Sequence, residues 1–61
     1  MLLKAIRTQK GWSQRAVAAK AKMSYTYLCN VEKGKADPSL STLKRLAKVL
    51  KVKVAELVAD E

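Results

Sequence analysis

Residues 13–34 read SQRAVAAKAKMSYTYLCNVEKG, and they contain two helix starts in close succession. Ser13 is a good N-cap for a helix over 14–20, because its hydroxyl can accept a free amide of the first helical turn. The same pattern recurs at Ser24, which caps a helix over 25–33. Two short capped helices therefore follow each other closely along the chain.

The connection between these helices is short, since only residues 21–23 precede the second cap. A connection of this length forces a sharp crossing, as in a helix-turn-helix. Trp12 and Val17 flank the first cap at the spacing of a hydrophobic staple, and Met23 and Leu28 flank the second. These staples fix the angle at which the chain enters each helix.

Apolar spacing and terminating residues place the other elements. An apolar face over about residues 2–10 predicts a first helix that Gly11 ends. Gly34 and Pro38 bracket a loop, because proline cannot continue a helix. The loop separates the helix-turn-helix from the second half of the chain.

A helix with a continuous apolar stripe is expected after this loop. Ser39 and Ser41 are both candidate caps, and Ser39 is preferred because it follows the proline directly. A last short helix is expected over 54–59. The sequence thus predicts an all-α, compact five-helix bundle in one domain over 1–61, with the helix-turn-helix proper over about 14–33. The stripe consists of Leu40, Leu43, Leu46, Ala47 and Leu50.

The residue inventory argues against catalysis. The chain has 61 residues, no histidine and one cysteine, so the commonest general base and metal ligand are absent and no internal disulfide can form. Its two glycines do not form a phosphate-binding loop. We expect no enzymatic activity, no cofactor and no metal.

The charge balance indicates a polyanionic partner. Thirteen basic and five acidic residues give a net charge of +8. Residues 1–23 hold six basic residues and no acidic one, whereas Glu56, Asp60 and Glu61 lie near the C-terminus. The C-terminal end is therefore the part least suited to face an anion.

A membrane location is not expected. No apolar run approaches the roughly 20 residues that span a bilayer. The first ten residues lack the apolar core of a signal peptide. We expect a cytoplasmic protein, associated with the nucleoid through DNA.

From about residue 3 to residue 58, the ordered set of motifs resembles the Cro/repressor-type helix-turn-helix family, also called XRE-like. Each motif is weak alone, but their order along the chain is specific. The resemblance implies the lambda-repressor-like fold, with the helix over 25–33 in the major groove of DNA. The motifs are Trp12-Ser13-Gln14, Val17-Ala18, Ala21-Lys22-Met23-Ser24, Leu28, Val31-Glu32-Lys33-Gly34-Lys35, Pro38-Ser39-Leu40, Leu43, Leu46-Ala47, Leu50-Lys51-Val52-Lys53-Val54 and Glu56-Leu57.

The resemblance also implies which residues contact DNA. Tyr25 and Thr26 at the start of the recognition helix would read bases, and so would Asn30 about a turn and a half later. Asn30 can pair with adenine, and Thr26 can donate a hydrogen bond or place its methyl against thymine. Tyr27 is a weaker candidate for DNA contact, and the alternative is that its ring packs at the edge of the core. Cys29 is most simply a small residue on the helix surface without a role in binding. The residues expected on the DNA backbone are Gln14, Arg15, Ser24, Tyr27, Lys33 and Lys35.

Two further sets have structural or dimeric roles by the same resemblance. Arg7 and Glu32 match a partly buried salt bridge that locks the first helix to the third. Val54, Leu57 and Val58 match a dimer interface, and the alternative is that they only close the core.

Three lysines depart from the family pattern. Lys22 and Lys51 stand where glycine is common at helix ends, and Lys53 replaces the usual small polar cap of the last helix. A residue other than glycine costs ~1–2 kcal/mol in a left-handed conformation. Either Lys22 accepts this strain or the turn differs locally.

We therefore expect a sequence-specific DNA-binding transcriptional regulator, most simply a repressor that binds a two-fold operator on double-stranded DNA as a homodimer. Activation through contact with polymerase is the variant of this hypothesis. The alternative from another class is an antitoxin-like or other protein-interaction module of the same fold, with a toxin as partner. Steep salt dependence of binding would distinguish the DNA reader from the protein-binding module.

Overall fold

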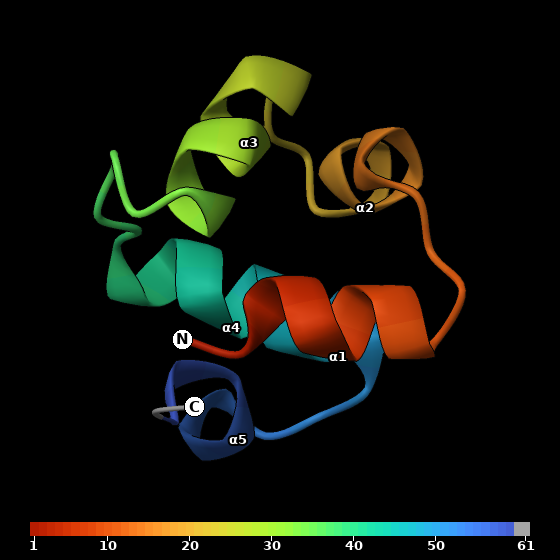
Figure 1. Ribbon diagram of the computed structural model, residues 1–61. Coiled ribbons are helices and arrows are strands. Elements are labelled where there is room, and N and C mark those ends of the chain that lie inside the picture. Colours follow the sequence, from red (N-terminus) through yellow and green to blue (C-terminus); the bar gives the residue numbers. More distant parts are fainter. Residues whose placement is uncertain (60–61) are drawn as a thin grey trace.

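The computed structural model describes residues 1–59, which form five α-helices and no strand (Figure 1). The all-α, five-helix prediction is confirmed. Three helices end one residue short of the expected bounds, because their last residues are caps. Asp60 and Glu61 lie outside the described residues. The helices are α1 (Leu3–Gln9), α2 (Gln14–Lys20), α3 (Tyr25–Glu32), α4 (Leu40–Leu50) and α5 (Val54–Val58).

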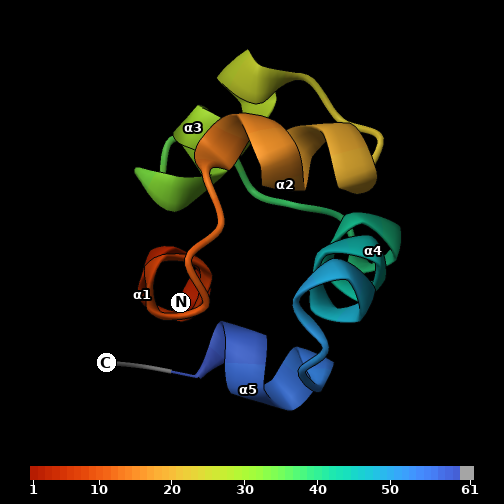
Figure 2. The same cartoon turned by 90° about the vertical axis from the view of Figure 1, so that its right-hand side faces the viewer.

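The helices stack in three levels. α1 and α4 lie at the middle level on opposite sides of the molecule, α2 and α3 lie above them, and α5 crosses below (Figures 1 and 2). α2 contacts both α3 and α4, while α5 contacts α1 and α4. The helix-turn-helix therefore occupies one end of the molecule, opposite α5.

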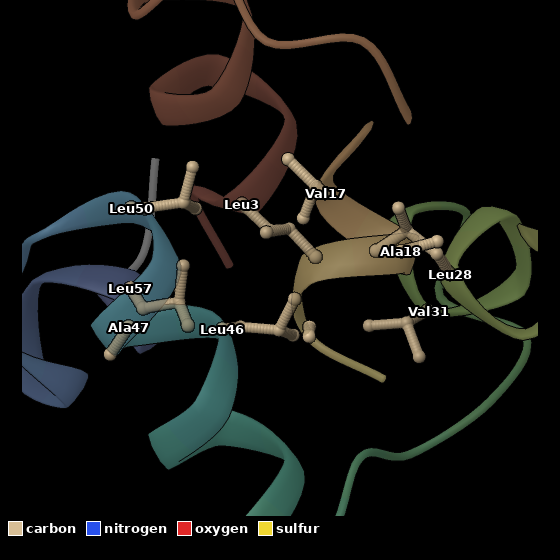
Figure 3. Packing of buried hydrophobic residues seen from close by; sticks show 10 residues of the cluster. Leu3, Val17, Ala18, Leu28, Val31, Leu46, Ala47, Leu50 and Leu57 are labelled. Carbon is tan, nitrogen blue, oxygen red and sulfur yellow. The ribbon is translucent and has the colours of Figure 1, made fainter. Parts of the chain in front are cut away.

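All five helices contribute to one hydrophobic core (Figure 3). Fully burying one such side chain stabilises the fold by ~1.5–3 kcal/mol relative to leaving it exposed. Trp12, Met23 and Leu43, which the sequence places in or next to the core, are half-buried against it. The largest fully buried side chains are Leu3, Val17, Leu28, Leu46, Leu50 and Leu57.

Leu57 belongs to this core and not to an outer surface. Its exposed fraction is 0%, and its carbonyl accepts a 2.9 Å hydrogen bond from the Leu2 amide. The expectation that Leu57 forms a dimer interface is wrong, because no part of its side chain reaches solvent. Val54 is half-buried and Val58 is 42% exposed, so Val58 is the large apolar side chain that α5 presents most openly.

Serine hydroxyls begin three of the helices. In each case the hydroxyl accepts the backbone amide three residues later, which satisfies one of the free donors of the first turn. Ser39, not Ser41, caps α4, as the sequence predicted. The donor–acceptor distances are 3.0 Å for Ser13 and Ala16, 3.0 Å for Ser24 and Tyr27, and 3.2 Å for Ser39 and Thr42.

α5 begins differently, because a lysine stands at its cap position. The backbone amide of Lys53 donates to Oε1 of Glu56 at 3.4 Å. The Glu56 carboxylate thus provides an acceptor at the helix start, where negative charge is favourable.

The first four helices all end in the same way. After each helix one residue takes a positive φ, and the next residue donates its amide to the carbonyl five positions back. The residues with positive φ are Gly11, Lys22, Gly34 and Lys51. The amide–carbonyl pairs are Trp12 and Arg7 at 3.0 Å, Met23 and Ala18 at 3.0 Å, Lys35 and Asn30 at 2.8 Å, and Val52 and Ala47 at 3.0 Å.

Lys22 and Lys51 therefore keep the backbone that glycine would adopt without strain. Their φ angles are 57° and 58°. The turn between α2 and α3 does not differ locally, so Lys22 accepts the strain. Met23 and Val52, which follow the two lysines, pack against the core and hold this geometry in place.

We predict that Lys22→Gly and Lys51→Gly each increase the free energy of unfolding by about 1 kcal/mol, because the left-handed strain is removed. Urea denaturation of the purified variants measures this change. Lys48→Gly, inside α4, is the matched control and should lower stability by about 1 kcal/mol. A loss of stability in all three variants would contradict the strain assigned to Lys22 and Lys51.

Candidate nucleic-acid interface

The start of α3 projects at the end of the molecule that α2 and α3 form (Figure 1). α2 crosses this end beside it, and the short turn between the helices packs Ala21 into the core (Figure 2). An exposed helix start with a second helix across it is the geometry that enters a major groove.

The three residues expected to read bases differ in exposure. Tyr25 is 39% exposed and Thr26 is exposed, both in the first turn of α3. Asn30 lies in the last part of α3 and is half-buried. Its backbone carbonyl accepts the amides of Lys35 and Ala36 at 2.8 and 3.3 Å, which folds the following loop back onto α3.

Arg7 and Glu32 form an ion pair that links α1 to α3. Nε of Arg7 lies 2.7 Å from one carboxylate oxygen of Glu32, and Nη2 lies 3.2 Å from the other. The two side chains are only 8% and 3% exposed. The third nitrogen, Nη1, donates to the carbonyl of Trp12 at 2.8 Å, so the end of α1 is held in the same contact.

Gln14 links the Arg7–Glu32 pair to Tyr25 at the surface. Its Nε2 donates to Oε1 of Glu32 at 2.9 Å. Its carbonyl oxygen accepts the Tyr25 hydroxyl in a longer hydrogen bond of 3.4 Å. The guanidinium of Arg15 lies over the Tyr25 ring, 4.3 Å from the centroid, in a cation–π contact. Two consecutive residues of α2 therefore hold Tyr25.

Cys29 lies one turn after Tyr25 on α3 and is half-buried. A hydrogen bond and Coulomb interaction with Cys29 raise the pKa of the Tyr25 hydroxyl above its ordinary value, burial adds to the rise, and Arg15 opposes it. The ordinary tyrosine pKa is about 10, so Tyr25 keeps its proton at neutral pH.

The residues expected on the DNA backbone surround the start of α3 and the loop behind it. Arg15, Lys33 and Lys35 are exposed. Ser24 is exposed and caps α3, while Gln14 is half-buried beside Tyr25. Tyr27 is half-buried against the core, which corresponds to the alternative weighed from the sequence.

Two contacts of the site were missed at the level of sequence. These are the hydrogen bond from Gln14 to Glu32 and the stacking of Arg15 on Tyr25. The partners are eighteen and ten residues apart, so no local periodicity relates them. A glutamine at the start of a helix and a glutamate at the end of another were the available signals.

Among residues 1–59 there is no cluster of metal-ligating side chains, and none of their helices combines the length and apolarity needed to cross a membrane.

The sequence model of the helix-turn-helix family matches residues 3–57. The chain belongs to this helix-turn-helix family. The resemblance drawn from its motifs is confirmed, and the match is to a helix-turn-helix module and not to an enzyme family.

Named relatives of this helix-turn-helix domain are regulators. It is 39% identical over 59 residues to an immunity repressor protein of Bacillus phage phi105, covering 97% of this chain and 41% of that protein. It is 40% identical over 53 residues to an uncharacterized helix-turn-helix transcriptional regulator of Sinorhizobium fredii, covering 87% of this chain and 69% of that protein. The domain thus spans less than half of the phage repressor.

Solved structures share the fold of this helix-turn-helix domain. The restriction-modification controller protein C.AhdI of Aeromonas hydrophila has a TM-score of 0.88 and 34% identity, covering 90% of this chain and 83% of that one. The N-terminal DNA-binding domain of SinR from Bacillus subtilis has a TM-score of 0.86 and 32% identity, covering 97% and 87%.

We predict that Glu32→Ala lowers the free energy of unfolding by ~3–5 kcal/mol, because it leaves the Arg7 charge buried without its partner. Thermal and urea denaturation measure the loss. Glu56→Ala, at the exposed start of α5, is the control and should cost less than about 1 kcal/mol. Equal losses in the two variants would remove the special role of the Arg7–Glu32 pair.

Proposed function

We propose that this domain is a sequence-specific DNA-binding transcriptional regulator that inserts α3 into the major groove. The observation that carries the proposal is the exposed start of α3, where Tyr25 is held from the side by Gln14 and Arg15. A base-reading side chain must be presented in a fixed position, because direct readout depends on hydrogen-bond geometry at base edges. Thr26 lies beside Tyr25 and is open to the same groove.

The exposed cations supply the sequence-independent part of the binding. Arg15 lies at the start of α2, and Lys33 and Lys35 follow α3, so positive charge flanks the recognition helix on both sides. Gln14 and Ser24 stand at or next to helix starts, where amides and the helix dipole favour a phosphate. These residues position the protein, while Tyr25, Thr26 and Asn30 read the bases.

The simplest regulator of this kind is a repressor that acts as a homodimer. Two copies of α3 would then meet half-sites about 34 Å apart on a two-fold operator. Val58 and the partly open Val54 are the apolar side chains of α5 available for such a contact. The named phage relative is a repressor, and this supports occlusion of a promoter over activation.

One comparison favours a second candidate function, in which the domain binds another protein. The SinR protein has been solved in a complex with the SinI protein, and that chain matches this domain with a TM-score of 0.88 at 32% identity. The match covers 95% of this chain and 57% of that one. A toxin or polymerase would be a partner of this kind. Binding to such a partner would tolerate salt, because buried apolar surface would drive it.

We predict that Thr26→Ala and Asn30→Ala each weaken binding to the preferred duplex by ~1–3 kcal/mol and relax the base preference at one position. Selection from a random duplex library, followed by titration of the selected duplex, measures both effects. If a variant binds every sequence equally less tightly, the residue contacts phosphate and does not read a base.

We predict that Lys33→Ala weakens binding to all duplexes alike and lowers the slope of log affinity against log salt by about one unit. The control is Lys53→Gln, which removes a charge at the opposite end of the domain beside α5. Its salt slope should stay that of the unsubstituted protein. An unchanged slope in Lys33→Ala would remove this residue from the interface.

A further inference from the structure

A chain of hydrogen bonds runs from the core to the tip of α3, and its direction is fixed at the inner end. Arg7 can only donate, and the Glu32 carboxylate can only accept. Their ion pair, with a shortest distance of 2.7 Å, is almost completely buried. Glu32, the member of the pair that Gln14 contacts, therefore offers Gln14 acceptors alone.

The direction passes through the side-chain amide of Gln14. Oε1 of Glu32 lies 2.9 Å from the Gln14 amide and accepts a hydrogen from it, so the NH2 group of Gln14 must face inward. The carbonyl oxygen of Gln14 then faces Tyr25. Because a carbonyl oxygen only accepts, the Tyr25 hydroxyl must donate its single hydrogen in this contact.

The second neighbour of the hydroxyl does not free this hydrogen. Cys29 lies one turn further along α3, where it raises the pKa of the Tyr25 hydroxyl, and its sulfur is a weak acceptor. Whether the hydrogen is directed at Gln14 or at Cys29, it stays within the protein. The lone pairs of the tyrosine oxygen are what the exposed side chain can present to a ligand.

We infer that Tyr25 reads DNA as a hydrogen-bond acceptor, and that its target is the exocyclic amino group of adenine or cytosine. These two groups, N6 of adenine and N4 of cytosine, are the base donors of the major groove. The acceptors at N7 and O6 of guanine, N7 of adenine and O4 of thymine do not bond to this hydroxyl. Gln14 acts as a positioning residue that sets which end of the O–H group faces the groove.

This inference rests on the proposed function, so the experiment begins with a duplex selected by the protein from a random library. Comparing that selection with one made by Tyr25→Phe identifies the base pair at which tyrosine matters. A base analogue then removes one group at that pair without changing the protein. For adenine, 2-aminopurine lacks the amino group in the major groove but still pairs with thymine, and 7-deazaadenine lacks only the N7 acceptor.

We expect loss of the amino group to weaken binding of the unsubstituted protein by about threefold to tenfold, as for one hydrogen bond. Tyr25→Phe should bind both duplexes equally, and loss of N7 should have no effect that depends on Tyr25. For a cytosine target, pyrimidin-2-one removes the corresponding amino group. A Tyr25-dependent loss with the deaza base, and none on removal of the amino group, would overturn the inference.

The doubly substituted Gln14→Ala, Cys29→Ala protein tests the source of the direction. With neither acceptor in place, the tyrosine hydrogen is free to turn outward, so the ratio of affinities for the two duplexes should fall toward one. Lys33→Ala is the control: it lowers both affinities and keeps the ratio. If the double variant keeps the full ratio, Gln14 and Cys29 do not set the direction. Failure to select any duplex would refute the proposed function itself, while selection with no base pair sensitive to Tyr25 would overturn only the inference.

Discussion

The ion pair between Arg7 and Glu32, together with Gln14, ties three of the five helices to one another. Two buried charges are costly unless their hydrogen bonds are satisfied. Here all three guanidinium nitrogens have acceptors, and one carboxylate oxygen also accepts Gln14. The pair fixes α1 against α3, and through Gln14 it fixes α2 as well. The mutual position of these helices is thus set by directional bonds in addition to apolar packing.

The helices are short, so they depend on hydrogen bonds at their ends and between them. The longest helix has 11 residues and the shortest has five, whereas isolated helices below about 12–15 residues are marginal in water. Serine caps at three starts and a repeated hydrogen-bonded motif at four ends satisfy the backbone groups that short helices leave open. At two of these ends the chain uses lysine with a positive φ. These lysines keep a positive charge at each end, although glycine would adopt the same backbone without strain.

Local features of the sequence predicted the helices well. Ser13, Ser24 and Ser39 act at short range, so the starts of three helices could be read directly from the chain. The burial of Leu57 could not be predicted in this way. Burial depends on which other helices pack against α5, and a helix of this length shows almost no apolar periodicity. The bond from Gln14 to Glu32 was also out of reach, since it joins the start of α2 to the end of α3, and these meet only in the folded chain.

The two exposed side chains at the start of α3 differ in how freely they can be exchanged. Tyr25 is bonded to Gln14 and stacked by Arg15, so its replacement disturbs α2 as well. Thr26 is exposed beside it and has no side-chain hydrogen bond to the rest of residues 1–59. Under the proposed function, a new target sequence is reached most simply by exchanging residue 26, whereas a change at residue 25 calls for compensation at residue 14. At the start of α3, redesign therefore has one independent position and one coupled pair to work with.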